Sequence, residues 1–160
     1  MSALSGGCQC GAVRFRIDGE IRHTSVCHCR MCQKAFAAPF GAFASVAMGD
    51  VVWSRGQRKL FQSSEGVARG FCGDCGTPLT FEAASGAGNN IGLAICAFDD
   101  PSALPPQLQL DLASRVAWLE RLGDLPTRRP EDVAAQEATY GPRTSFQHPD
   151  HDTETWPPAR

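Results

Sequence analysis

The sequence predicts a mainly β protein that is built of short strands and stabilised by bound metal. Three features support this prediction. Short apolar runs recur along the chain and are bounded by glycine, proline and other turn residues. Residues 13–18 and 107–112 alternate apolar and polar side chains, which is the period of a half-buried strand. Most of the 8 cysteines lie in closely spaced groups, as metal ligands do.

The length and charge of the chain exclude several functional classes. A chain of 160 residues with 42% hydrophobic residues is enough for one domain with a core. A net charge of −2 and a pI near 6.1 argue against a nucleic-acid partner. The N-terminal sequence has no signal-like apolar stretch, and nothing approaches the ~18 apolar residues of a membrane span. We therefore expect a cytoplasmic protein with no membrane partner, whose thiols stay reduced.

The predicted elements follow the apolar runs in order. Glycine ends the first alternating strand, and the proline at position 39 ends a short helical stretch, since residues before proline avoid helical backbone. A glycine-rich loop is expected at 83–90, and a short helix at 130–138 with proline in its first turn. The strands are expected at 13–18, 21–25, 40–46, 51–53, 59–62, 79–81, 91–98 and 108–112. We expect a globular zinc domain over residues 1–126 and a polar C-terminal tail over 127–160.

Four cysteines form one complete set of metal ligands. They are a CxC pair, Cys8 and Cys10, and a CxxC pair, Cys72 and Cys75, each flanked by glycines that permit tight turns. A lone CxxC is also typical of redox proteins, but the second pair favours metal. Four thiolates saturate a tetrahedral zinc ion, so this set predicts a structural site.

A second cluster, Cys27, Cys29 and Cys32, has the spacing CxCxxC. Three local thiolates leave one coordination position on a zinc ion, which is the pattern of a catalytic site. The alternative is a second structural zinc, completed by His28, His23 or Cys96. The side chain of His28 is expected to point away from the ion, toward solvent or a residue that contacts the ligands. Cys96 is expected to be a core residue in a buried strand.

The cysteine pattern and its surrounding blocks resemble the GFA family, which comprises the glutathione-dependent formaldehyde-activating enzymes and relatives of centromere protein V. The resemblance covers roughly residues 4–126. It rests on the segments GGCQCGAVRF, VCHCRMCQK, APFGA, LFQSS, ARGFCGDCGTPLTF, AFDDP and WLERLGDLP in that order.

The resemblance implies a zinc-stabilised fold similar to the Mss4-like, or β-tent, architecture. It also implies two Zn²⁺ sites, one structural and one catalytic, in the two cysteine clusters defined above. The activity named for the family is condensation of formaldehyde with glutathione to S-hydroxymethylglutathione, a carbon–sulfur lyase reaction. The expected partners are therefore a small-molecule thiol, such as glutathione, and a small electrophile.

Two functions of different classes follow from the sequence. The first is a zinc-dependent enzyme that joins or releases a thiol and a small electrophile, and the second is a non-catalytic zinc module that binds another macromolecule. Arg69, Gln33 and Lys34 are candidates for binding a glutathione carboxylate, or are ordinary solvated surface. Trp53 and Trp118 are expected in the core or in a pocket wall.

Overall fold

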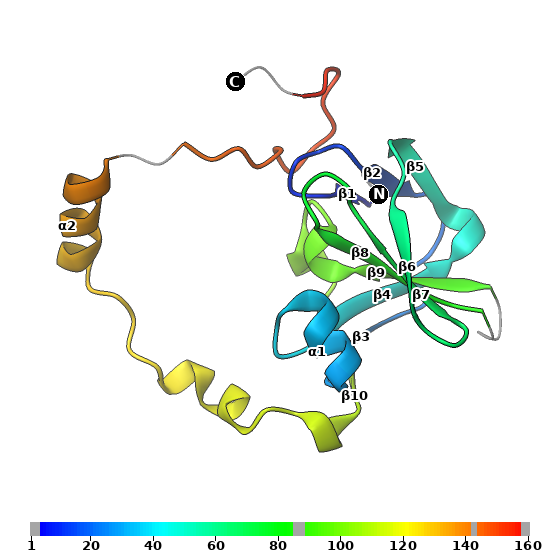
Figure 1. Cartoon of the computed structure of the whole chain (residues 1–160), viewed down its shortest axis with the longest axis horizontal. Helices are drawn as coiled ribbons and strands as arrows, with labels where there is room; N and C mark the ends of the chain where they lie inside the picture. The colour runs from blue at the N-terminus through cyan, green and yellow to red at the C-terminus, as the bar shows by residue number, and fades with distance from the viewer. Residues whose placement is uncertain (1–3, 85–88, 142–143, 158–160) are drawn as a thin grey trace.

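The fold is a small β structure with two sheets and one extended C-terminal arm (Figure 1). In this computed structural model, residues 4–84, 89–141 and 144–157 are described. The mainly β prediction is confirmed. The expected loop at 83–90 lies partly outside the described residues, at 85–88, and its flanks extend the two strands on either side.

The first sheet carries the N-terminal segment. Its three described strands run antiparallel in the order β1-β2-β5. Phe15 of β2 is fully buried and makes edge-to-face contacts with Trp53 of β5 and with Phe98, at centroid distances of 5.9 and 5.1 Å. The period-two alternation predicted for this strand is confirmed at Phe15, Arg16 and Ile17, but Arg14 is buried as well, in an ion pair with Asp99. The bounds are β1 Ser5–Gly7, β2 Arg14–Ile17 and β5 Val51–Arg55.

The second sheet has seven described strands in the order β10-β3-β4-β9-β8-β7-β6. Its pairs are antiparallel except for β10, which lies parallel to β3 at the edge. The bounds are β3 His23–Cys27, β4 Gly41–Ala47, β6 Lys59–Ser64, β7 Val67–Phe71, β8 Pro78–Ala83, β9 Asn90–Ala94 and β10 Leu108–Leu110.

The two faces of this sheet serve different purposes. Ala44, Val46, Ile91 and Leu93 point from β4 and β9 into the main core against the first sheet. The alternate positions on the same strands point to the other face, where Phe43 joins Cys27 and Cys32 in a second, smaller cluster. Since side chains alternate along a strand, the register that buries the core also places the second cysteine cluster on the opposite face.

The helices are short, and they lie between strands or in the C-terminal arm. The helix α1, Arg30–Phe36, follows β3 and stops at Ala37, which adopts left-handed backbone (φ 48°) two residues before Pro39. The arm beyond β10 contains α2, Pro130–Tyr140, with its proline in the first turn as predicted. The 3₁₀ turns are η1 Met48–Asp50, η2 Ile95–Ala97, η3 Pro101–Ala103, η4 Leu112–Ser114 and η5 Ala117–Asp124.

The arm leaves the β body at β10, and its last part returns to the first sheet (Figure 1). The returning segment is held by an ion pair from Asp152 to Arg14 at 2.8 Å and by a hydrogen bond that Trp156 donates to the carbonyl of Cys10 at 2.7 Å. The ring of His148 is buried and lies against Gly11. The expected domain boundary at residue 126 stays a prediction.

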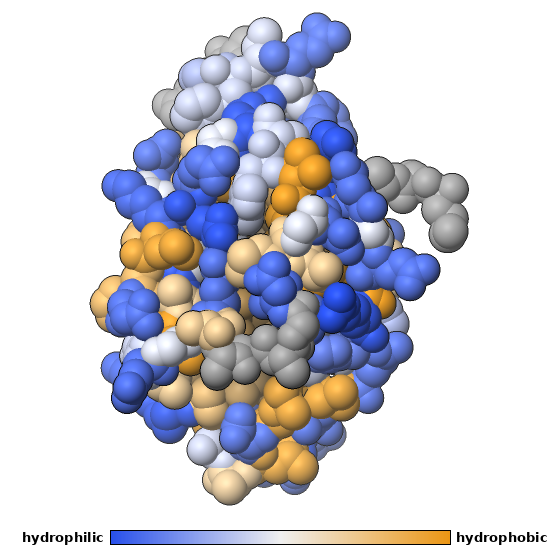
Figure 2. Space-filling view, turned by 90° about the vertical axis from the view of Figure 1, so that its right-hand side faces the viewer, coloured by the Kyte–Doolittle hydropathy of each residue, from blue (hydrophilic) through white to orange (hydrophobic). Residues whose placement is uncertain are grey.

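The exposed surface carries apolar groups in separate patches on a mostly hydrophilic face (Figure 2). Trp118 is 57% exposed in η5, so its expected place in the core is wrong, whereas Trp53 is half-buried against Phe15. Among the described residues, no helix combines the length and apolar character needed to cross a membrane.

Candidate functional site: two clusters of cysteine thiols

The first cluster brings Cys8, Cys10, Cys72 and Cys75 together, with all four sulfur atoms within 4.8 Å of one another. The Cys8–Cys10 and Cys10–Cys72 sulfur distances are 3.5 and 3.8 Å. Four ligands at the usual Zn–S length of about 2.3 Å lie roughly 3.8 Å apart in a tetrahedron. The donor set and its spacing therefore fit a zinc ion.

Two tight turns of similar design present these thiols. In each, the backbone N–H of a glycine with positive φ donates to the carbonyl of the first cysteine: Gly11 to Cys8, and Gly76 to Cys72, both at 3.0 Å. The turns are joined by a hydrogen bond from the Gln9 backbone N–H to the Thr77 hydroxyl at 3.0 Å. Thiols separated by 62 residues in sequence meet because the two turns are fixed to each other.

Hydrogen bonds favour the thiolate form at some sulfurs of the first cluster, although burial raises the pKa of Cys10 and of Cys72. The backbone N–H groups of Val13 and Asp74 donate to the sulfurs of Cys8 and Cys72, at 3.3 and 3.4 Å. Burial raises the pKa of Cys75, but hydrogen bonds from the side chain and backbone of Thr77 outweigh this and lower the pKa to about 6. A low pKa supplies the deprotonated sulfur that a metal requires.

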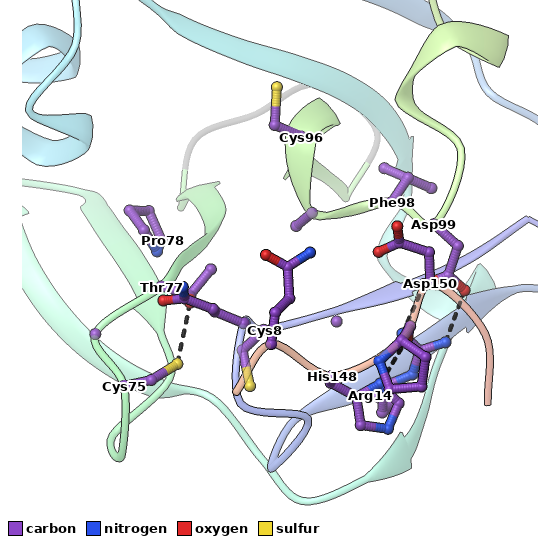
Figure 3. A pocket seen from close by; sticks show the side chains of 16 residues that line it. Cys8, Arg14, Cys75, Thr77, Pro78, Cys96, Phe98, Asp99, His148 and Asp150 are labelled. Atoms are coloured by element: carbon purple, nitrogen blue, oxygen red, sulfur yellow. Dashed lines mark hydrogen bonds and ion pairs between the residues drawn. The ribbon is translucent and has the colours of Figure 1, made fainter. Parts of the chain in front are cut away.

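A polar cavity of about 430 Å³ adjoins the first cluster, under the C-terminal segment (Figure 3). Its wall includes Cys8 and Cys75, and at one end Arg14 pairs with Asp99 at 2.7 Å. Because four thiols already complete the coordination of this cluster, a molecule in the cavity would find no free position on the metal.

Cys96 also borders this cavity, on the side away from Cys8 and Cys75 (Figure 3). The expectation that Cys96 is a core residue is wrong, because its side chain is exposed. Strand β9 ends at Ala94, and the 3₁₀ turn η2 turns Ile95 and Ala97 inward and Cys96 outward. Cys96 belongs to neither of the two clusters found among the described residues.

The second cluster brings Cys27, Cys29 and Cys32 within 4.8 Å of one another. Cys27 ends β3, Cys29 is the N-cap of α1, and Cys32 lies in the first turn of that helix, where its backbone N–H donates to the Cys29 sulfur at 3.4 Å. Because the helix begins almost directly after the strand ends, the three sulfurs of the CxCxxC motif lie close together. Cys27 and Cys32 are buried, at 8% and 2% exposure.

None of the three residues considered as a fourth ligand joins this cluster among the described residues. His28 points away from the sulfurs, as predicted, but it is buried and not solvent-facing: its Nε2 lies 3.0 Å from the Gln109 side-chain oxygen, and its ring stacks edge-on against Phe40. The donor set of three thiols fits a zinc ion with a free position.

Two charged residues, Arg69 and Asp111, lie against the second cluster. Arg69 of β7 is 7% exposed, and its Nη2 donates to the Cys32 sulfur at 3.5 Å. The Cys27 thiol donates to the carboxylate of Asp111 at 3.1 Å. Arg69 was considered for a substrate carboxylate, and Asp111 was not considered at all.

The electrostatic surroundings of the three thiols differ. Burial raises the pKa of Cys27 well above its ordinary value, and the neighbouring Asp111 raises it further. Burial also raises the pKa of Cys32, although Arg69 acts in the opposite direction. For Cys29, the hydrogen bonds from Cys32 and Cys27 outweigh burial and lower the pKa. Arg69 and the helix start therefore favour thiolates on one side of the cluster, and Asp111 opposes them on the other.

The other two residues expected to contact a substrate, Gln33 and Lys34, do not face the second cluster as free groups: Gln33 bonds to the backbone and Lys34 is exposed. Gln33 is buried, and its amide donates to the carbonyls of His28 and Ser114 at 2.8 and 2.9 Å, so it fixes the chain around the cluster. Lys34 is exposed on the outer face of α1. A pocket of about 260 Å³ opens beside Cys27 and Cys32 on the sheet face that carries Phe43.

Comparison with known proteins places this geometry in context. The chain is 33% identical over 86 residues to an uncharacterized lyase of Schizosaccharomyces pombe, a match that covers 54% of this chain and 62% of the yeast protein. The fold of the present chain is similar to that of a Rhodobacter sphaeroides protein of known crystal structure, with a TM-score of 0.53 and 20% identity. The match covers 66% of the present chain and 98% of the bacterial chain. Residues 3–113, which hold all eight cysteines, match the family described as glutathione-dependent formaldehyde-activating enzyme. The chain therefore belongs to the GFA family.

Proposed function

We propose that this protein is a zinc-dependent lyase of the carbon–sulfur class, which joins or releases a thiol and a small electrophile. The family's named pair, glutathione and formaldehyde, is the first to test. The observation that carries the proposal is the second cluster: three convergent thiols beside a pocket, with no fourth cysteine or histidine in the set found among the described residues. The name of the yeast relative, an uncharacterized lyase, supports a lyase without specifying the bond.

The residues of the second cluster have distinct roles in this proposal. Cys27, Cys29 and Cys32 would hold the ion, which supplies a free coordination position and favours the thiolate form of an incoming thiol. Arg69 balances charge, since three thiolates around a dication leave one net negative charge and its guanidinium contacts Cys32. The walls of the pocket hold the reacting molecules next to the sulfurs.

The reaction needs no oxidant or reductant. The thiol sulfur forms a bond to the carbonyl carbon, the C=O π electrons move to oxygen, and the proton lost from sulfur ends on that oxygen. Release is the same sequence in reverse. A metal bound by three anionic sulfurs is a weak Lewis acid, so holding the thiolate is a better use of this site than polarising the carbonyl.

The four-thiol cluster is proposed as the structural site. Two of its ligands lie in the turn between β1 and β2, and the other two lie in the turn between β7 and β8. An ion bound there therefore links segments that are distant in sequence. Loss of such an ion is loss of folding free energy.

The test combines metal stoichiometry with turnover. We expect native mass spectrometry of the purified chain to show two zinc ions, and NMR to show thiol-dependent formaldehyde consumption. Cys32→Ser should abolish turnover and leave one tightly held ion in a folded protein. Cys96→Ser is the matched control, because Cys96 lies in neither cluster, and it should keep both ions and full activity. Two ions with no thiol binding or turnover would refute the enzyme and favour a non-catalytic zinc module that binds another macromolecule.

A further inference from the structure

The pocket beside the second cluster has a mainly apolar lining. It holds about 260 Å³, and Cys27 and Cys32 of the second cluster are part of its lining. The large apolar side chains of the lining are Phe43, Phe81 and Leu110. Phe43 and Phe81 contact each other at a centroid distance of 5.9 Å. Such a pocket suits the apolar body of a small molecule whose reactive end lies at the sulfurs.

No Asp, Glu, Lys or Arg side chain lines this pocket among the described residues. The polar lining consists of the neutral groups Ser25, Ser45 and Asn90, together with His23 at the rim. The segment 85–88, which follows the lining residue Ala83 in sequence and lies outside the described residues, reads Ser-Gly-Ala-Gly and carries no charge. A carboxylate placed in this pocket would lose its hydration without gaining a cationic partner.

The buried cation at the second cluster, Arg69, lies outside this lining. Arg69 pairs with Phe81 across β7 and β8, and its guanidinium lies 5.2 Å from the centre of the Phe81 ring. It is not part of the pocket lining, and its one hydrogen bond found among the described residues goes to the Cys32 sulfur. One face of its guanidinium is thus covered by the Phe81 ring, and its charge faces the thiolates.

From this geometry we infer that the pocket receives an uncharged apolar group, about the size of a phenyl ring, carried by the thiol substrate. The inference rests on the proposed function and narrows it: the preferred thiol has an apolar body and is not an anionic peptide such as glutathione, whose two carboxylates and ammonium group find no partners here. The carbon–sulfur bond still forms and breaks as described above, with the same balance of atoms.

Gly92 offers a direct test of this assignment. It lies in β9 on the pocket wall, and a Cβ built there would stand 3.4 Å from Cδ1 of Phe43 and 3.6 Å from Cβ of Phe81. These are ordinary van der Waals contacts, so Gly92→Ala should fold normally while its methyl group fills part of the pocket. Gly49→Ala is the matched control, because a Cβ at Gly49 meets nothing within 4 Å and Gly49 is not part of the lining.

The experiment is calorimetric titration of the zinc-loaded full chain with benzyl mercaptan, glutathione and 2-mercaptoethanol. We expect benzyl mercaptan to bind at least tenfold more tightly than glutathione, which corresponds to about 1.4 kcal/mol. Gly92→Ala should weaken benzyl mercaptan at least fivefold and leave 2-mercaptoethanol, which is too small to fill the pocket, within twofold. Gly49→Ala should change neither value.

The outcomes separate this inference from the proposed function. If 2-mercaptoethanol binds but glutathione binds as tightly as benzyl mercaptan, or if Gly92→Ala leaves benzyl mercaptan unchanged, the apolar pocket is not the substrate site and the function stands. If no thiol binds the zinc-loaded chain, the proposed function fails and the inference falls with it.

Discussion

The buried guanidinium of Arg69 gives the sharpest test of how the second cluster holds a metal. Its Nη2 lies 3.5 Å from the Cys32 sulfur, and its Nε and Nη1 have no hydrogen-bond partner among the described residues. A buried cation with so few partners is costly unless it faces negative charge. We therefore predict that Arg69→Gln weakens zinc binding at the second cluster and leaves the first cluster unaffected.

The magnitude follows from the geometry. A unit charge 3.5 Å from a thiolate contributes about 5 kcal/mol at an effective dielectric constant of ~20. Much of this is offset, because glutamine removes a buried charge and can still donate one hydrogen bond to sulfur. Residues that contact metal ligands typically contribute 10–100-fold to affinity, or about 1.4–2.7 kcal/mol. We expect a loss in that range.

The assay is competition for zinc with a graded series of chelators, followed by native mass spectrometry. The wild type should lose its two ions at two chelator strengths, and Arg69→Gln should shift the weaker transition alone. Arg58→Gln is the matched control: Arg58 also lies over an aromatic ring, at 4.6 Å from the Trp53 centroid, and is largely buried, but it pairs with Glu82 and not with a thiol. It should lower stability without shifting either transition selectively.

A second readout separates an electrostatic role from a purely structural one. Without metal, burial raises the pKa of Cys32, the thiol that Arg69 contacts, so the guanidinium faces a neutral sulfur. Arg69→Gln should therefore not destabilise the metal-free protein and is expected to stabilise it. Equal losses of stability in the metal-free and zinc-loaded proteins would refute this reasoning, as would an unchanged chelator transition.

Three further predictions follow from the same structure. Cys72→Ser should remove the ion of the first cluster and lower the free energy of unfolding by at least about 3 kcal/mol, or the Tm by roughly 6–12 °C. Cys32→Ser should leave the melting transition nearly unchanged. Equal Tm shifts in calorimetry would contradict a structural first cluster and a catalytic second cluster. Asp111→Asn replaces a carboxylate with an N–H donor to Cys27, and asparagine tolerates the left-handed backbone at this position (φ 57°). Chelator competition should therefore show tighter zinc binding at the second cluster, whereas weaker binding would identify Asp111 as a ligand. Burial raises the pKa of Glu82, but the ion pair with Arg58 outweighs this and holds the pKa below the ordinary 4.5. The pair therefore stabilises the fold above pH 4.5 and loses its effect as the pH falls. In urea unfolding, the difference in free energy between wild type and Glu82→Gln, about 1.5–3 kcal/mol, should be constant above about pH 5 and shrink in acid.

Local spacing explains which parts of the site the sequence could predict. The CxC, CxxC and CxCxxC groups bring their own sulfurs together, because a turn of two to four residues leaves few other arrangements. The alternating strand at Phe15 was predictable for the same reason, since one residue in two faces the core. The prediction for Cys96 failed because the apolar run continues past the point where β9 stops pairing, and hydrophobicity alone does not mark where a strand leaves its sheet.

The residues that set the chemistry around the thiols depend instead on strand pairing between distant segments. Asp111 reaches Cys27 because β10 lies parallel to β3, with Leu110 in register with Cys27 although 83 positions separate them. Arg69 lies beside Phe81 through the pairing of β7 with β8, and Phe81 lies opposite Gly92 through the pairing of β8 with β9. A shift of one residue in any of these pairs would turn the side chain to the core face. The cysteine motif can therefore fix where a metal binds while the register of four other strands decides its charge balance and the shape of the pocket. Family membership alone does not determine the substrate, because most of the residues that line the pocket lie outside the cysteine motifs.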